Sequence, residues 1–180
     1  MHRGNKEGKV PSDVTSPWHR RAVIRGIRDS LQFATSPAIT ELCSSDDTHA
    51  HFSRARNARL IMGNIVPDIR SPATEPYCIW YPDFASEETY RELARQYPSM
   101  RYQVGRACAA AGFTDLYKEL DLLPEVSIAE EARNAAECAE CTEGFKVAEV
   151  AEDAEIYQII MSAPQRWAVM DDFTRAVNTE

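Results

Sequence analysis

Apolar residues recur with a helical period along most of the chain beyond residue 86. Tyr90, Leu93, Ala94 and Tyr97 follow the i, i+3, i+4, i+7 spacing of one helix face. The same period continues through residues 100–111, 113–120, 156–163 and 167–177. Ser127 and Glu130 match a capping box, so we expect a further helix to begin near Ser127. These patterns predict an all-α fold.

Three of these helical segments resemble one another. They read TYRELARQYP (89–98), LYKELDLLP (116–124) and IYQIIMSAP (156–164), and their tyrosines Tyr90, Tyr117 and Tyr157 are 27 and 40 residues apart. A proline follows each tyrosine after seven or eight residues. Proline ends one helix and fits the first turn of the next. The chain therefore predicts three helix–Pro–helix units that bury their apolar faces by stacking, with the tyrosines in the core.

The segments before residue 86 are less regular. The spacing predicts a helix over 54–66 and a loop over 34–53. Residues 71–86 carry Pro72, Pro76 and Pro82, which forbid a regular helix. We interpret 71–86 as an extended segment packed across helix ends.

Aromatic side chains supply the candidate binding residues. Those near Pro82 require burial or a partner, so they form either a binding surface or a cover for the open end of the stack. A pocket for a small molecule is the alternative, lined by Tyr77, Trp80, Tyr102 and Trp167. The predicted binding residues are Tyr77, Trp80, Tyr81, Tyr102 and Trp167.

Charge divides the chain. Residues 1–60 hold ten Lys/Arg and six Asp/Glu, whereas residues 61–180 hold ten and twenty-two, which gives the net charge of −8. We predict a basic, largely disordered N-terminal arm over 1–50 and a helical-repeat domain over 51–180 with an acidic insertion at 134–153. Because an acidic body repels phosphates, no nucleic-acid partner is expected. The basic amphipathic segment 19–33 fits a membrane-surface or targeting helix, but we favour a surface helix or an unpacked arm, and no membrane partner.

Candidate chemistry is sparse. Cys138 and Cys141 form a C-x-x-C, yet structural zinc needs four ligands, and all four histidines lie at residue 51 or earlier. The pair His49 and His51 lies in a polar loop. Without a nucleophile elbow or a Gly-rich phosphate loop, we expect no catalytic residues, no metal and no cofactor. Five cysteines without a secretory signal predict reduced thiols and a cytoplasmic location, with the nucleus as the alternative.

The segment CAAAGFTDLYKEL resembles the centre of an ankyrin repeat. Gly112 matches the turn glycine, Asp115 the acidic position, and Leu116, Tyr117 and Leu120 the apolar positions of the second helix. The T-P-L-H box is replaced by residues 103–106, and Phe113 stands where a histidine is usual. The resemblance implies helical hairpins, an ankyrin-like short α-solenoid stack.

A longer run resembles a family of small, uncharacterised, ankyrin-like proteins of filamentous fungi. It extends from YCIWYPDFASEETYRELARQYPSMRYQ to PEVSIAEEAR and covers roughly 54–133 and 154–178. The resemblance implies no known catalytic residues. Our leading expectation is a non-catalytic protein that binds an unknown protein partner. The alternative is an accessory protein, a minor enzyme or small-molecule carrier, of a fungal secondary-metabolite pathway.

Overall fold

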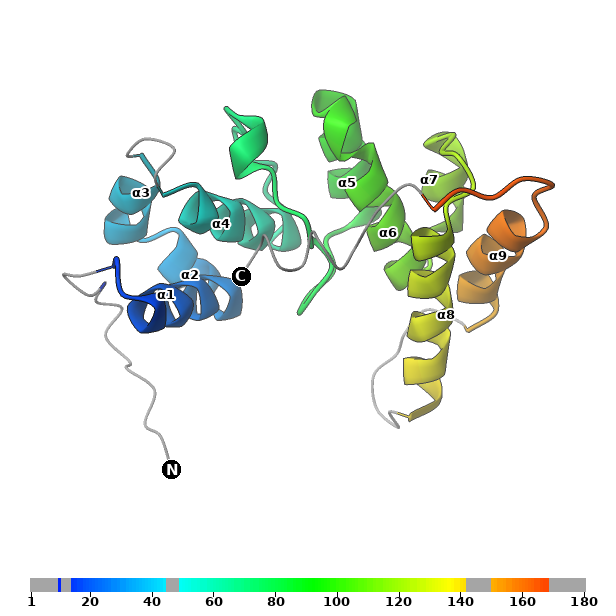
Figure 1. Cartoon of the computed structure of the whole chain (residues 1–180), viewed down its shortest axis with the longest axis horizontal. Coiled ribbons are helices and arrows are strands. Elements are labelled where there is room, and N and C mark those ends of the chain that lie inside the picture. Colours follow the sequence, from blue (N-terminus) through cyan, green and yellow to red (C-terminus); the bar gives the residue numbers. More distant parts are fainter. Residues whose placement is uncertain (1–9, 11–13, 45–48, 142–149, 169–180) are drawn as a thin grey trace. The chain divides into compact units, whose positions relative to one another are not determined.

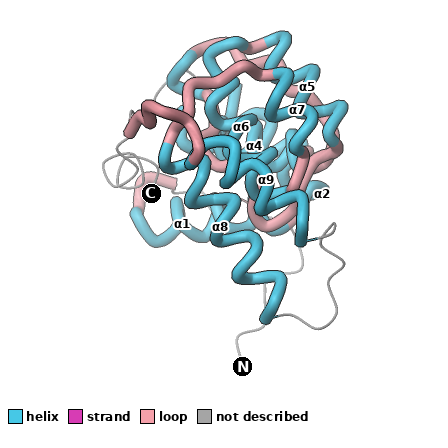
Figure 2. The backbone as a smooth tube through the Cα atoms, turned by 90° about the vertical axis from the view of Figure 1, so that its right-hand side faces the viewer, coloured by secondary structure: helices cyan, strands magenta, loops and turns pink. Residues whose placement is uncertain are grey.

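The structure of the chain is a computed structural model. It describes residues 10, 14–44, 49–141 and 150–168, with the backbone alone for 136–141 and 150–154. Over these residues the elements are helices joined by loops, and no strand is drawn for them in Figure 2. The predicted all-α class is confirmed for this part of the chain. Within the same ranges, no helix is both long and apolar enough to cross a bilayer.

The chain divides into two compact units, residues 1–77 and 78–180. The first contains the helices α1 (Pro17–Asp29), α2 (Leu31–Ala34), α3 (Pro37–Ser44) and α4 (Ala50–Met62), followed by the short 3-10 helix η2 (Pro72–Thr74). The second contains α5 (Glu87–Gln96), the 3-10 helix η3 (Pro98–Met100), α6 (Arg101–Ala111), α7 (Thr114–Glu119), α8 (Val126–Cys141) and α9 (Val150–Met161).

The first unit has a small apolar core in which α1 lies against α4 (Figure 1). Its buried side chains come from all four helices: Val23, Ile27, Ala34, Ile39, Phe52 and Ala55. Two hydrogen bonds fix α4 further. The Nε of Arg56 donates to the carbonyl of Ala34 (3.1 Å), and the amide of Asn57 donates to the carbonyl of Thr74 (3.0 Å).

This unit differs from the predicted arm and loop. Residues 17–44 are helical where the sequence predicted a largely disordered arm over 1–50, and α3 and the start of α4 occupy the expected loop 34–53. Tertiary packing explains why α1 is ordered: Val23 and Ile27 are one turn apart on this helix, and both are buried in the core. The segment is a surface helix with its arginines outward, one of the two interpretations that we favoured.

The second unit follows the predicted helix–Pro–helix order twice. Pro98 lies between α5 and α6, and Pro124 lies between α7 and α8. After α9 the order changes, because residues 162–168 have no helix, and the rest of the predicted helix 167–177 lies outside the described residues. Figure 1 shows α8 and α9 side by side, with α6 against α8.

The predicted turn glycine is confirmed. Gly112 ends α6 in the left-handed conformation, with φ 76° and ψ 22°, and the amide of Phe113 donates to the carbonyl of Cys108. Tyr90 and Tyr117 are buried as predicted, whereas Tyr157 is only partly buried. The acidic insertion falls on α8, α9 and residues outside the described ranges.

Candidate functional site

A short loop before α5 is fixed at both ends by one hydroxyl. Tyr90 is fully buried, and its hydroxyl donates to the carbonyl of Ile79 (2.8 Å) while accepting from the amide of Ala85 (3.1 Å). Burial raises the pKa of this phenol well above its usual range, so the hydroxyl keeps its proton and its role as donor. Ile79 and Ala85 are themselves buried. The chain between Ile79 and Ala85 is therefore held at both ends as a fixed loop.

The loop presents two aromatic side chains to solvent. Tyr81 is 65% exposed and Phe84 is 44% exposed, although they lie between buried neighbours. The Tyr81–Pro82 peptide bond is cis. At the far end Ser86 begins α5, because its Oγ accepts from the amide of Thr89 (3.3 Å). An ordered, exposed aromatic loop is thus joined directly to a capped helix. We call residues 80–84 the aromatic loop.

Trp80 anchors the start of the aromatic loop. Trp80 is 9% exposed, and the guanidinium of Arg106 lies 5.0 Å from the centroid of its ring. Arg106 is also buried and pairs with the carboxylate of Glu131 on α8. A buried charge is tolerated when a counter-ion and a π face compensate it. This cluster joins the loop, α6 and α8.

A second polar contact joins α6 to α8. One carboxylate oxygen of Glu125 accepts from the amides of Ser127 (2.9 Å) and Ile128 (3.3 Å), and from the hydroxyl of Tyr102 (3.3 Å). Glu125 therefore caps α8, which begins at Val126. The predicted start near Ser127 is correct within one residue, but the capping side chain is Glu125.

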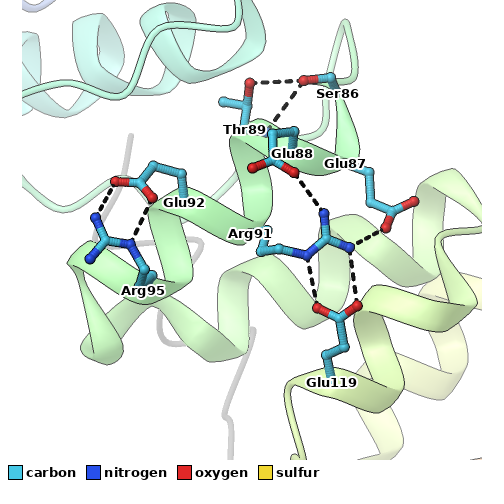
Figure 3. A network of polar contacts seen from close by, with 8 residues as sticks. All are labelled: Ser86, Glu87, Glu88, Thr89, Arg91, Glu92, Arg95 and Glu119. Carbon is cyan, nitrogen blue, oxygen red and sulfur yellow. Dashed lines mark hydrogen bonds and ion pairs between the residues drawn. The ribbon is translucent and has the colours of Figure 1, made fainter.

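A salt-bridge network fixes α5 against α7 (Figure 3). The guanidinium of Arg91 bonds both carboxylate oxygens of Glu119 (2.8 and 3.1 Å) and also reaches Glu88 (2.9 Å) and Glu87 (2.5 Å). The hydrogen bonds from Arg91 lower the pKa of Glu119. Glu87, Glu88 and Glu119 thus share one cation, and Figure 3 shows Glu92 paired separately with Arg95 on α5.

The structure brings together only some of the predicted binding residues. Tyr102 lies one turn from Arg106 on α6, so Trp80 and Tyr102 belong to neighbouring parts of the α6–α8 interface. Trp167 pairs through its backbone with residues next to Glu125 and is 39% exposed. Tyr81 is in the aromatic loop. Tyr77 is the last residue of the first unit and is partly buried.

Sequence reasoning missed several residues that shape this site. Phe84 is not among the predicted binding residues, Tyr90 was predicted only as a core residue, and no role was predicted for Arg106 or Glu125. A signal for Arg106 was available, because a lone arginine inside the apolar run VGRACAAA predicts a buried ion pair. The role of the Tyr90 hydroxyl had no sequence signal.

Where the structure describes them, the histidines and cysteines considered for chemistry are packed against other side chains or buried. His51 lies with its ring centroid 4.1 Å from that of Phe52, and His49 stacks on the same ring at 5.9 Å. Burial raises the pKa of the Cys108 thiol, which keeps it protonated near neutral pH. Among the described residues no three His, Cys, Asp or Glu side chains converge as metal ligands. The side chains of Cys138 and Cys141 lie outside the described residues.

A comparison with protein families places the similarity in the second unit. A family model described as the YKP1 C-terminal domain matches residues 80–144. The match begins at Trp80 and includes the aromatic loop and α5 to α8. No curated protein and no solved structure was found to match the chain.

Proposed function

We propose that the second unit is a non-catalytic helical module that binds a protein partner through the aromatic loop. One observation carries the proposal: the Tyr90 hydroxyl closes the loop from inside and so holds Tyr81 and Phe84 outward. Exposed aromatic residues are enriched where protein interfaces concentrate their binding energy.

The fixed geometry of the aromatic loop favours a role in binding. A loop that is ordered before binding loses less conformational entropy when a partner arrives. Both ends of this loop are buried, and Trp80 is held under Arg106. The two aromatic side chains are therefore presented on a rigid base, and a partner with an apolar surface would cover them at a low entropic cost.

The finer architecture is part of the same proposal. We propose that α5–α6 and α7–α8 are two hairpins of a short ankyrin-like stack, supported by their helix–Pro–helix order and by the left-handed Gly112. A cytoplasmic location accords with the unpaired Cys108. The accessory role in fungal secondary metabolism stays a prediction, since it depends on the family resemblance alone.

Affinity capture with the full chain tests the proposal. The double variant Tyr81→Ser, Phe84→Ser removes both exposed rings, and Trp18→Ser serves as the matched control because Trp18 is 78% exposed in the first unit. Proteins enriched from cells of the source organism are quantified and then rebound in purified form. We expect the double variant to lose at least about tenfold in affinity and the control to bind like the wild type. Equal binding by the double variant would overturn the proposal.

A further inference from the structure

The start of α5 carries more negative charge than its one cation balances. Glu87, Glu88 and Glu119 all bond the guanidinium of Arg91, as Figure 3 shows. The N-terminus of a helix adds roughly half a positive charge. The three carboxylates against this guanidinium and this partial charge leave an excess of about 1.5 negative charges. The side chain of Glu88 is 82% exposed, so part of this excess faces solvent. We call Glu87, Glu88 and Glu119 the acidic rim.

The acidic rim begins close to the aromatic loop. Glu88 follows Phe84 by four residues, so their Cα atoms are at most about 14 Å apart. Ser86 caps α5 between them, and the hydroxyl of Tyr90 holds the loop from inside. The loop and the first turn of α5 therefore form one continuous, fixed piece of chain. A short segment of a partner is long enough to contact the exposed rings and the acidic rim together.

The rest of the second unit does not cancel this charge. Residues 78–180 hold nine Lys/Arg and twenty Asp/Glu, which gives a net charge of −11. Two ion pairs next to the acidic rim, Arg95 with Glu92 and Lys118 with Glu155, are each neutral. The electrostatic field at the aromatic loop therefore attracts cations and repels acidic surfaces.

A guanidinium is the cation that best fits an aromatic ring beside a carboxylate. It stacks on ring faces and bonds a carboxylate through two parallel N–H donors, whereas an ammonium is a point charge. The chain uses this arrangement once internally, because Arg106 lies over the ring of Trp80 and pairs with Glu131. The outer side of the aromatic loop offers the same two chemistries, exposed rings and an exposed carboxylate.

We propose that the partner segment recognised by the aromatic loop carries arginine, and that its guanidinium binds between an exposed ring and the acidic rim. This inference rests on the proposed function and adds the chemistry of the partner. Charge complementarity of this kind selects among partners and speeds their association, and salt weakens it.

Selection from a displayed library of random peptides, with the full chain as the target, tests this chemistry. The variant Glu87→Gln, Glu88→Gln neutralises two acids and leaves one carboxylate of the acidic rim on the guanidinium. The matched control is Asp115→Asn, Asp121→Asn, which makes the same change in net charge at exposed acids of α7 and the turn after it. Circular dichroism checks that each variant keeps its helices.

We expect the wild type and the control to enrich arginine over lysine in the selected peptides, and the glutamine variant to lose this enrichment. A selected peptide should bind the glutamine variant at least about fivefold more weakly in fluorescence anisotropy, and added salt should narrow the difference. Selection without arginine enrichment, or no selected peptide at all, overturns the inference. So does a wild type that self-associates with rising concentration when the glutamine variant does not, because the occupant is then a second copy.

The variant Tyr81→Ser, Phe84→Ser separates this inference from the proposed function. If it loses the selected peptides while the glutamine variant keeps them, the aromatic loop binds a partner but not through arginine. If it keeps arginine-rich peptides that the glutamine variant loses, the acidic rim binds alone, and a guanidinium placed between ring and rim is wrong. Affinity capture, as described above, decides the proposed function in either case.

Discussion

At the scale of single residues, Gly112 joins two helices by a conformation that other residues avoid. Its φ of 76° lies in the left-handed region, and the turn is buried. We expect Gly112→Val to lower the free energy of unfolding by about 1–3 kcal/mol, since a β-branched side chain is strained there. Chemical denaturation measures the change. Gly112→Asn is the matched control and should cost less, because asparagine tolerates this region. An unchanged midpoint for the valine variant would contradict the hairpin turn.

Removing the Tyr90 hydroxyl tests its two hydrogen bonds separately from the packing of its ring. Tyr90→Phe keeps the buried ring but leaves the carbonyl of Ile79 and the amide of Ala85 without this partner. We expect a loss of about 1–3 kcal/mol in stability, together with a weaker affinity for any partner of the aromatic loop. Urea denaturation measures the first effect and partner titration the second.

Tyr117→Phe provides the control for Tyr90. Tyr117 is also buried, and burial raises the pKa of its phenol to about 12, but it lies on α7 outside the aromatic loop. Its substitution should leave partner binding unchanged. If Tyr90→Phe likewise binds with wild-type affinity, the hydroxyl does not position the loop for recognition.

At the scale of elements, the ion pair between Arg91 and Glu119 joins α5 to α7. The pKa of Glu119 is lowered from its usual 4.5 by Arg91. A lowered carboxyl pKa adds stability above the unfolded value, and that contribution is lost as the pH falls through the folded value. We therefore expect the stability difference between wild type and Arg91→Gln to be present at pH 7 and to shrink below about pH 4.5.

The pair is exposed, so salt should also reduce this difference. Thermal unfolding across pH and salt measures it. Arg95→Gln is the control, because Arg95 pairs with Glu92 inside α5 and joins no second helix. A difference that is constant from pH 3 to pH 7 would show that Arg91 acts through packing of its side chain instead of through charge.

The same elements show what sequence could and could not predict. Helical period and proline position identified α5 to α9, because local spacing alone determines which faces are apolar. The capping side chain of α8 was misjudged, since Glu125 is placed for that role by the hydroxyl of Tyr102, from 23 residues earlier in the chain. For α1 the sequence left a surface helix and an unpacked arm open, because its apolar stripe is short and its burial depends on α4. At the site, the binding role of Trp80 and Tyr81 stays a prediction. The lone arginine in VGRACAAA could have indicated a buried ion pair for Arg106, but not that its partners are Trp80 and Glu131.

At the scale of the whole molecule, the boundary between the units is at residues 77 and 78, where composition had suggested 50 and 51. The chain changes from net basic to net acidic near the earlier boundary, but the apolar core of the first unit continues across it. Phe52 and Ala55 on α4 are buried with Val23, Ile27 and Ile39 from the helices before it. A cut at residue 50 would divide one apolar core between two pieces.

This difference in boundary predicts how fragments behave. Residues 78–180 contain their own fully buried side chains, among them Leu93, Met100, Leu116 and Ile156. We expect this fragment to be helical and to melt cooperatively in circular dichroism. The fragment 51–180 is the matched comparison: it keeps α4 but lacks the helices that cover Phe52. It should bind the dye ANS more strongly than 78–180, since exposed apolar surface attracts the dye. If 51–180 melts cooperatively without added dye binding and 78–180 does not fold, the folding unit begins at the earlier boundary.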